Sequence, residues 1–168
     1  MVTANGVNND VSVYRGNGTG TVNFAGATTL PGTASYRLIA ADLDRDGRSD
    51  VIVLHGDGTA SVSYGTPTGL APAQVVQPIA PYAAWIAAGD FDGDGRLDLA
   101  VMSNPPSADA TVDVFRNTPA GFTHAVTLDV PDTVPWSIVT GDFNGDGRAD
   151  LAVPGGFASV VRIYLAAP

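Results

Sequence analysis

An acidic loop of nine residues occurs three times in this chain and limits its fold more than any other feature. The copies occupy residues 42–50 (DLDRDGRSD), 90–98 (DFDGDGRLD) and 142–150 (DFNGDGRAD). Each copy has an oxygen-bearing side chain at loop positions 1, 3, 5 and 9, glycine at position 6 and arginine at position 7. Ca²⁺ binds about six to eight oxygen atoms, and glycine permits the positive φ that a tight reversal needs. The pattern therefore predicts one calcium ion in each loop.

The expected ligands are the side chains at positions 1, 3, 5 and 9 and the backbone carbonyl at position 7. They are Asp42, Asp44, Asp46, Arg48 and Asp50; Asp90, Asp92, Asp94, Arg96 and Asp98; and Asp142, Asn144, Asp146, Arg148 and Asp150. The three guanidinium groups are expected to pack over their own loops. Asn144 replaces an aspartate at position 3, which keeps an oxygen and removes a charge, so the third site is expected to bind more weakly than the other two.

Two alternatives compete with this interpretation. An EF-hand loop needs a glutamate at position 12 and flanking helices, but position 12 here is Val53, Val101 or Val153, and the flanks are short apolar runs typical of strands. The other alternative is an Asp/Gly-rich turn that binds no metal. Three copies in the same register favour a metal loop that joins two strands.

Charge and composition exclude several classes of protein. All 17 acidic residues are Asp, all eight basic residues are Arg, and 11 of the acids lie in the three loops. Three Ca²⁺ ions would change the net charge from −9 to −3, and this acidic balance argues against a nucleic-acid partner. No apolar run approaches the ~18 residues of a membrane span, and no signal peptide is visible. Dependence on calcium suits an extracellular location.

The spacing of the loops predicts the fold class. The loops start at residues 42, 90 and 142, and a repeat near 50 residues suits a four-stranded β-propeller blade. The chain is therefore expected to be all-β, a single partial propeller over residues 1–168 with about three and a half blades of antiparallel strands. The expected repeats are 1–30 (the last three strands of a blade), 35–80, 83–131 and 135–168 (the first three strands of a blade).

The loop and its flanks resemble a known family. The segments Ile86-Ala-Ala-Gly89 and Asp90-Phe-Asp-Gly-Asp-Gly-Arg-Leu-Asp-Leu-Ala-Val101 closely resemble FG-GAP/VCBS repeats, which build the propellers of integrin α-subunits and of some fungal lectins. The resemblance covers nearly the whole chain and is strongest at residues 85–101 and 136–153. It implies a blade whose first hairpin loop binds Ca²⁺ through the residues named above.

A propeller ring usually needs about four to eight blades, more than this chain supplies. We therefore expect either a piece of a longer propeller or a ring completed by further copies, with a homodimer favoured. The sequence does not determine how the terminal strands would pair or how many blades the assembled ring would have.

A few residues outside the loops are candidates for ligand binding. Tyr36, Trp85 and Trp136 precede the three loops by five or six residues. Such aromatic side chains either stack on sugar rings at a propeller face or pack between blades. His55 and His124 have no partner placed by sequence spacing, so we expect them at the surface without a catalytic role.

Three functions stay open at this point. The first is a non-enzymatic binding module, lectin-like or adhesive towards glycans or protein surfaces, in which calcium is structural. The second is a scaffold or accessory unit, excised from a larger secreted protein or engineered, with no ligand of its own. The third is an enzyme, and it is the weakest because every clustered carboxylate is already assigned to calcium.

Overall fold

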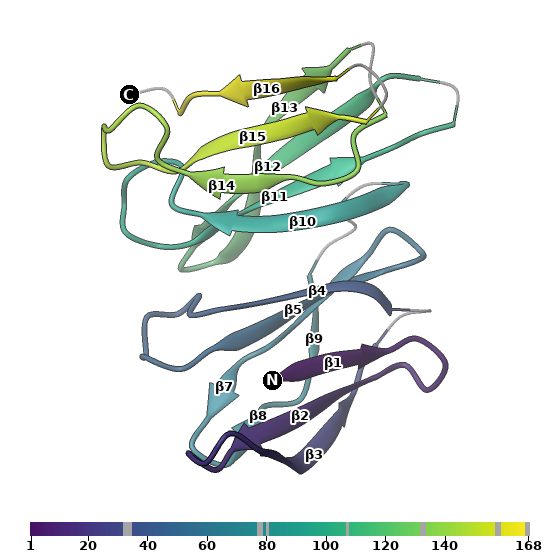
Figure 1. Cartoon of the computed structure of the whole chain (residues 1–168), viewed down its shortest axis with the longest axis vertical. Coiled ribbons are helices and arrows are strands. Elements are labelled where there is room, and N and C mark those ends of the chain that lie inside the picture. Colours follow the sequence, from purple (N-terminus) through teal and green to yellow (C-terminus); the bar gives the residue numbers. More distant parts are fainter. Residues whose placement is uncertain are drawn as a thin grey trace.

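The computed structural model describes residues 1–31, 35–76, 79, 81–106, 108–131, 134–156 and 159–166. These residues form antiparallel strands and contain no helix that could cross a membrane. The strands build four main sheets and one small ribbon (Figure 1). The predicted all-β fold of antiparallel sheets is confirmed for the described residues, and the sheets are consistent with propeller blades.

The four sheets follow one another along the chain. The first contains β1 (Val2–Asn5), β2 (Asp10–Gly16) and β3 (Val22–Thr29), and the second contains β4 (Ser35–Ala41), β5 (Asp50–His55), β6 (Ala60–Ser63) and β9 (Gln74–Val76). The third contains β10 (Ala83–Gly89), β11 (Asp98–Ser103), β12 (Ala110–Thr118) and β13 (Gly121–Val130), and the fourth contains β14 (Val139–Gly141), β15 (Asp150–Gly155) and β16 (Val160–Tyr164). The ribbon, β7 (Gly65–Thr66) with β8 (Gly69–Leu70), is a feature that the sequence did not predict.

The strand that follows each acidic loop is covered on both faces, which explains its continuous apolar sequence. All residues of β5 and β11 are buried. Because successive side chains point to opposite faces of a sheet, Ile52 packs with Leu99 between the second and third sheets, while Val51 faces the first sheet. In the same way Met102 packs with Leu151 between the third and fourth sheets. The core is thus divided into layers between neighbouring sheets.

The inner strands bring the sheets together. β4 contacts β1 on one side and β10 on the other, and β10 also contacts β14. The sheets follow one another as an arc, with the first and fourth at its two ends, and the described residues do not close a ring (Figure 1). Each acidic loop joins an inner strand to the second strand of its sheet, so the three loops lie at the same end of their sheets.

The first sheet corresponds to the last three strands of the third sheet. The β2–β3 pair has a bulge between Val13 and Tyr14, and the β12–β13 pair has one between Val114 and Phe115. Tyr14 then meets Phe24 edge-on, as Phe115 meets His124. This shared irregularity makes β2 and β3 similar to β12 and β13, and the equivalence of β1 to the strand that follows an acidic loop stays a prediction.

Candidate metal centre

Each acidic loop is curled by the same series of hydrogen bonds between aspartate side chains and backbone N–H groups. In the middle loop, the N–H of Asp94 donates to Asp92 Oδ1 at 3.1 Å, and the N–H of Arg96 donates to Asp94 Oδ1 at 2.8 Å. Asn and Asp side chains favour such bonds to the backbone two residues on. The first and third loops repeat both contacts. The regular spacing of acidic side chains therefore determines the local shape of the loop.

The first aspartate of each loop closes the turn. Asp90 accepts the N–H of Gly93 and of Gly95, each at 2.8 Å, through its two different oxygens. Gly95 has φ +84°, in the left-handed region that glycine adopts readily. Asp142 accepts equivalent bonds from Gly147 and Gly145, which hold the pKa of its carboxyl below the ordinary value. Backbone donors thus hold the first carboxylate of the loop in place.

The ninth aspartate is buried and ties the loop to the sheet. The Oδ2 atom of Asp98 accepts the N–H of Phe91 at 3.2 Å, and its Oδ1 atom accepts the N–H of Asn117 at 2.8 Å. Asp50 and Asp150 are held in the same way by the second residue of their own loop and by a residue just after the third strand of their sheet, Gly65 and Ala166 respectively. Burial raises the pKa of Asp50 and Asp98 above the ordinary value, although their backbone hydrogen bonds oppose this shift. A bound cation would relieve the cost of holding these buried charges.

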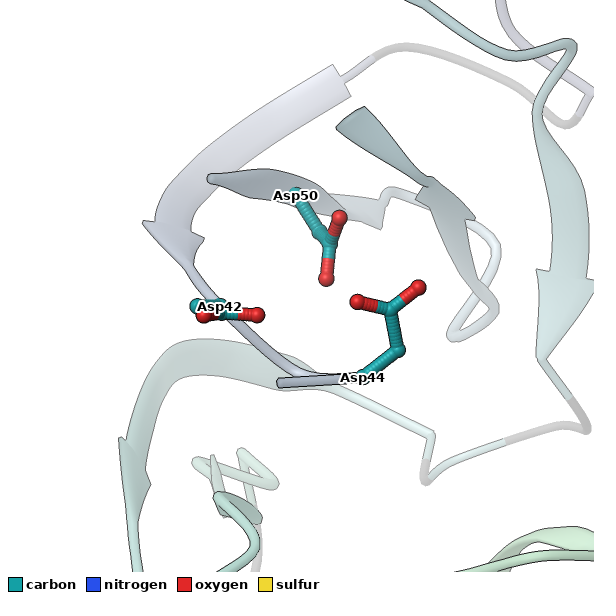
Figure 2. A group of neighbouring side chains, drawn as sticks. All are labelled: Asp42, Asp44 and Asp50. Carbon is teal, nitrogen blue, oxygen red and sulfur yellow. The ribbon is translucent and has the colours of Figure 1, made fainter. Parts of the chain in front are cut away.

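The carboxylates at loop positions 1, 3 and 9 converge. Asp42, Asp44 and Asp50 each place an oxygen within 4.8 Å of the others (Figure 2). The middle loop gathers its residues at the same positions with the same spacing. Two oxygens that share a Ca²⁺ ion at about 2.3–2.6 Å each lie no more than about 5 Å apart, so both groups fit the ion.

The other predicted ligands are placed differently. Asp46 and Asp94, at position 5, are not part of these groups, and Asp46 pairs with the guanidinium of Arg48 in its own loop. At positions 1, 3 and 9 the third loop offers two carboxylates and the amide of Asn144, whose Nδ2 donates to Asp146 at 3.0 Å. A ligand role for the arginine carbonyls stays a prediction.

Neighbouring loops contact one another. The N–H of Ala149 in the third loop donates to the carbonyl of Asp90 at 2.8 Å. Arg148 lies against Gly93 of the middle loop, whereas it was expected over its own loop. The amide of Asn117 donates to the carbonyl of Leu43 in the first loop at 2.8 Å. The three loops thus form one connected surface at the end of the sheets.

The aromatic candidates separate into different environments. Trp136 is 58% exposed, whereas Trp85 is partly buried against the core between the third and fourth sheets. The guanidinium carbon of Arg37 lies 3.9 Å from the centre of the Trp85 ring, which is a cation–π distance. Tyr36 belongs to β4, but its side chain is outside the described part of the structure. Of the two tryptophans, Trp136 is therefore the more exposed candidate.

One of the two histidines differs from the sequence expectation: His55 is buried, whereas His124 is exposed as expected. His55 is buried at the end of β5, where its Nε2 atom is 2.9 Å from the hydroxyl of Ser61, and burial lowers its pKa below the ordinary value. The Nε2 atom of His124 lies 3.1 Å from Asp113 and 3.0 Å from Thr127, on paired strands of the third sheet. The surface expectation is wrong for His55 alone. Strand pairing brings both histidines to their partners, which sequence spacing alone does not reveal.

Successive antiparallel sheets, three of which have an acidic hairpin loop between their first two strands, define a class of protein, a repeat protein whose units are consistent with propeller blades. The family model described as FG-GAP-like repeat matches residues 1–53 and 42–101, and the one described as FG-GAP repeat matches residues 134–164. The chain belongs to the FG-GAP repeat family.

The chain is also similar to the phosphatidylinositol-glycan-specific phospholipases D of three mammals. The protein of Mus musculus is 28% identical over 151 residues, that of Rattus norvegicus 27% over 153 and that of Homo sapiens 25% over 156. These matches cover 72%, 72% and 73% of this chain respectively, but only 18% of each relative. The chain therefore spans less than a fifth of the length of these curated relatives.

Proposed function

We propose that this chain is a non-enzymatic, calcium-stabilised binding module that works outside the cell. The observation that carries the proposal is the convergence of three carboxylates in each of two loops, at a spacing that fits Ca²⁺. A third loop shares their sequence and hydrogen bonds. FG-GAP repeats are non-catalytic units, so the activity named for the phospholipase relatives is not carried over to this chain.

Calcium in this proposal is structural. Without it, each loop holds its carboxylates close together, and their repulsion opposes folding. With a Kd of about 10⁻⁴ M and about 1 mM free Ca²⁺, each site adds roughly 1.4 kcal/mol to the free energy of unfolding. Three sites add about 4 kcal/mol, which raises the Tm of a chain of this size by about 8–16 °C. The affinity assumed here is typical of extracellular modules, which supports that location.

The test combines calorimetric calcium titration with thermal unfolding in calcium and in EDTA. About three ions per chain and a clear loss of Tm in EDTA are expected. Mg²⁺ should stabilise much less, because it demands a smaller octahedral shell. Asp44→Asn should weaken the first site, because it keeps an oxygen but removes a charge, while Asp109→Asn, an exposed aspartate outside the loops, should leave all three affinities unchanged. An identical melt in calcium and EDTA would refute the structural role.

For the ligand, we propose a glycan or protein surface bound at the end of the sheets opposite the acidic loops. Trp136 and Tyr82 are both exposed there, shortly before the inner strands begin. A glycan array on the calcium-loaded protein tests the proposal, with Trp136→Ala expected to abolish binding and Val7→Ala, a fully exposed residue between β1 and β2, as the control. Silence of the folded protein on the array would instead favour a scaffold or accessory unit.

We also propose that copies of this chain associate, with a dimer favoured. Several large apolar side chains are exposed on the outer strands of the two end sheets: Val22 and Phe24 on β3, and Val160, Val161 and Ile163 on β16. Exposed apolar surface of this kind supports association. Native mass spectrometry with and without calcium measures copy number and ions per chain together, and a monomer at micromolar concentration would rule the dimer out.

A further inference from the structure

One carboxylate of the middle loop is paired with an arginine from outside the loop. The Nε atom of Arg116, in β12, lies 3.2 Å from the Oδ2 atom of Asp92. Asp92 is the position-3 member of the carboxylate group formed with Asp90 and Asp98. Its side chain is 25% exposed, so the ion pair is partly shielded from water. A cation of the protein itself thus sits beside the oxygens proposed to bind calcium.

The position equivalent to Arg116 holds an uncharged residue beside each of the other two metal loops. The ninth aspartate of each loop accepts the N–H of one residue in the third strand or just after it, namely Gly65, Asn117 or Ala166. The residues that precede these three are Tyr64, Arg116 and Leu165. Tyr64 borders a cavity of about 210 Å³ together with Asp44. Of the three loops, the middle one alone has a cation at this position.

Two arginines within the loops pair with a carboxylate at a different loop position from that of Asp92. Arg48 pairs with Asp46, and the Nε atom of Arg96 lies 4.0 Å from Asp94. Both of these aspartates are at position 5, outside the converging groups. The contact between Arg116 and Asp92 is therefore of a different kind, because it engages an oxygen donor of the site.

We propose that Arg116 is an internal counterion that lowers the calcium affinity of the middle loop and stabilises that loop without metal. The inference rests on the proposed function of the loops. In the metal-free protein, Arg116 offsets the repulsion among three carboxylates. When a divalent cation enters the group, the guanidinium is a like charge at close range, so its interaction with the site is weaker than before. The contact between Arg116 and the loop is therefore more favourable without calcium than with it. This difference in free energy lowers the calcium affinity of the loop by the corresponding factor.

The chain supplies a matched control. Arg15 occupies the same position in β2 that Arg116 occupies in β12, two residues after the last residue before the shared bulge. It belongs to the first sheet, which has no acidic loop among the described residues, and its Nη2 atom lies 3.4 Å from the carbonyl of Pro67. Arg15→Leu and Arg116→Leu therefore remove the same charge from equivalent strands. Of the two arginines, Arg116 is the one that pairs with a carboxylate of a metal loop.

The experiment is a calcium titration of the whole chain followed by ¹H–¹⁵N NMR, in which the amides of Gly47, Gly95 and Gly147 report the three loops separately. In Arg116→Leu, the affinity at Gly95 should increase about five-fold, a coupling of the usual size for linked sites, while Gly47 and Gly147 change less than two-fold. Arg15→Leu should change none of them. The Tm of Arg116→Leu should also fall more in EDTA than in calcium.

A substitution that adds an arginine beside another metal loop tests the same inference in the opposite direction. Tyr64→Arg places a cation beside Asp44 and should weaken binding at Gly47 while leaving Gly95 unchanged. If the wild-type chain binds no calcium, the proposed function fails and the inference fails with it. If the wild-type chain binds calcium but Arg116→Leu leaves Gly95 unchanged or weakens binding there, the inference alone is overturned.

Discussion

Replacing the buried Asp98 by asparagine tests whether the ninth loop residue stabilises the fold in the absence of metal. Asp98 is 1% exposed and accepts two backbone N–H groups through its two oxygens. Asparagine has nearly the same shape but only one acceptor oxygen. One of the N–H groups, from Phe91 or from Asn117, would then face an amide that cannot accept its hydrogen bond.

The magnitude follows from these two bonds. A hydrogen bond to a charged group contributes about 1.5–3 kcal/mol, and an unsatisfied buried N–H costs about 1–3 kcal/mol. The neutral amide offsets part of this loss, because burial of the Asp98 carboxylate is unfavourable, as its raised pKa indicates. We expect a net loss of about 2 kcal/mol, or roughly 4–8 °C in Tm for a chain of this size.

The assay is thermal unfolding in EDTA, with Asp94→Asn as the control. Asp94 lies in the same loop, is exposed and holds only the N–H of Arg96 and a distant guanidinium. It should lose less than about 1 kcal/mol. In calcium, both variants should also bind the ion of the middle loop more weakly, because each loses a charge. If the two variants have the same Tm in EDTA, the buried hydrogen bonds of Asp98 do not stabilise the fold and the reasoning is refuted.

Four further predictions follow from the same structure. Burial lowers the pKa of His55, so the free energy of unfolding should be fully present above about pH 6.5 and fall as the pH decreases below that value, and urea unfolding of His55→Leu should not show this decrease. Gly65→Ala would place a Cβ 2.7 Å from the carbonyl oxygen of Ser49, so calorimetry should report a loss of about 1–3 kcal/mol and weaker calcium binding in the first loop. Leu99→Ala should cost about 2–5 kcal/mol in chemical unfolding because Leu99 is fully buried between two sheets. Asn144→Asp should tighten calcium binding at the third loop in the NMR titration by adding a charge, and an unchanged affinity there would contradict the ranking of the three sites.

Much of the fold was predictable because its signals are local. The alternation of acidic residues and glycine in residues 90–98 determines the hydrogen bonds that curl the loop, all within a few residues of one another. The apolar runs on either side, such as β11, could be recognised as buried strands from their composition alone. β14 is the exception. The last repeat was expected to begin at residue 135, but Trp136 to Ile138 lie outside a regular strand and β14 starts at Val139.

The sequence by itself determined the repeat, the family, the antiparallel blades and the acidic loops, because each follows from residues close together in the chain. The tertiary structure alone decided which side chains surround those loops. Arg116 reaches Asp92 from a strand 24 residues away, and the bulged pairing of β12 with β13 brings Asp113 to His124. The physical reason is that the register of strand pairing and the packing of sheets select these neighbours, and both arise only when distant segments bury their apolar faces together.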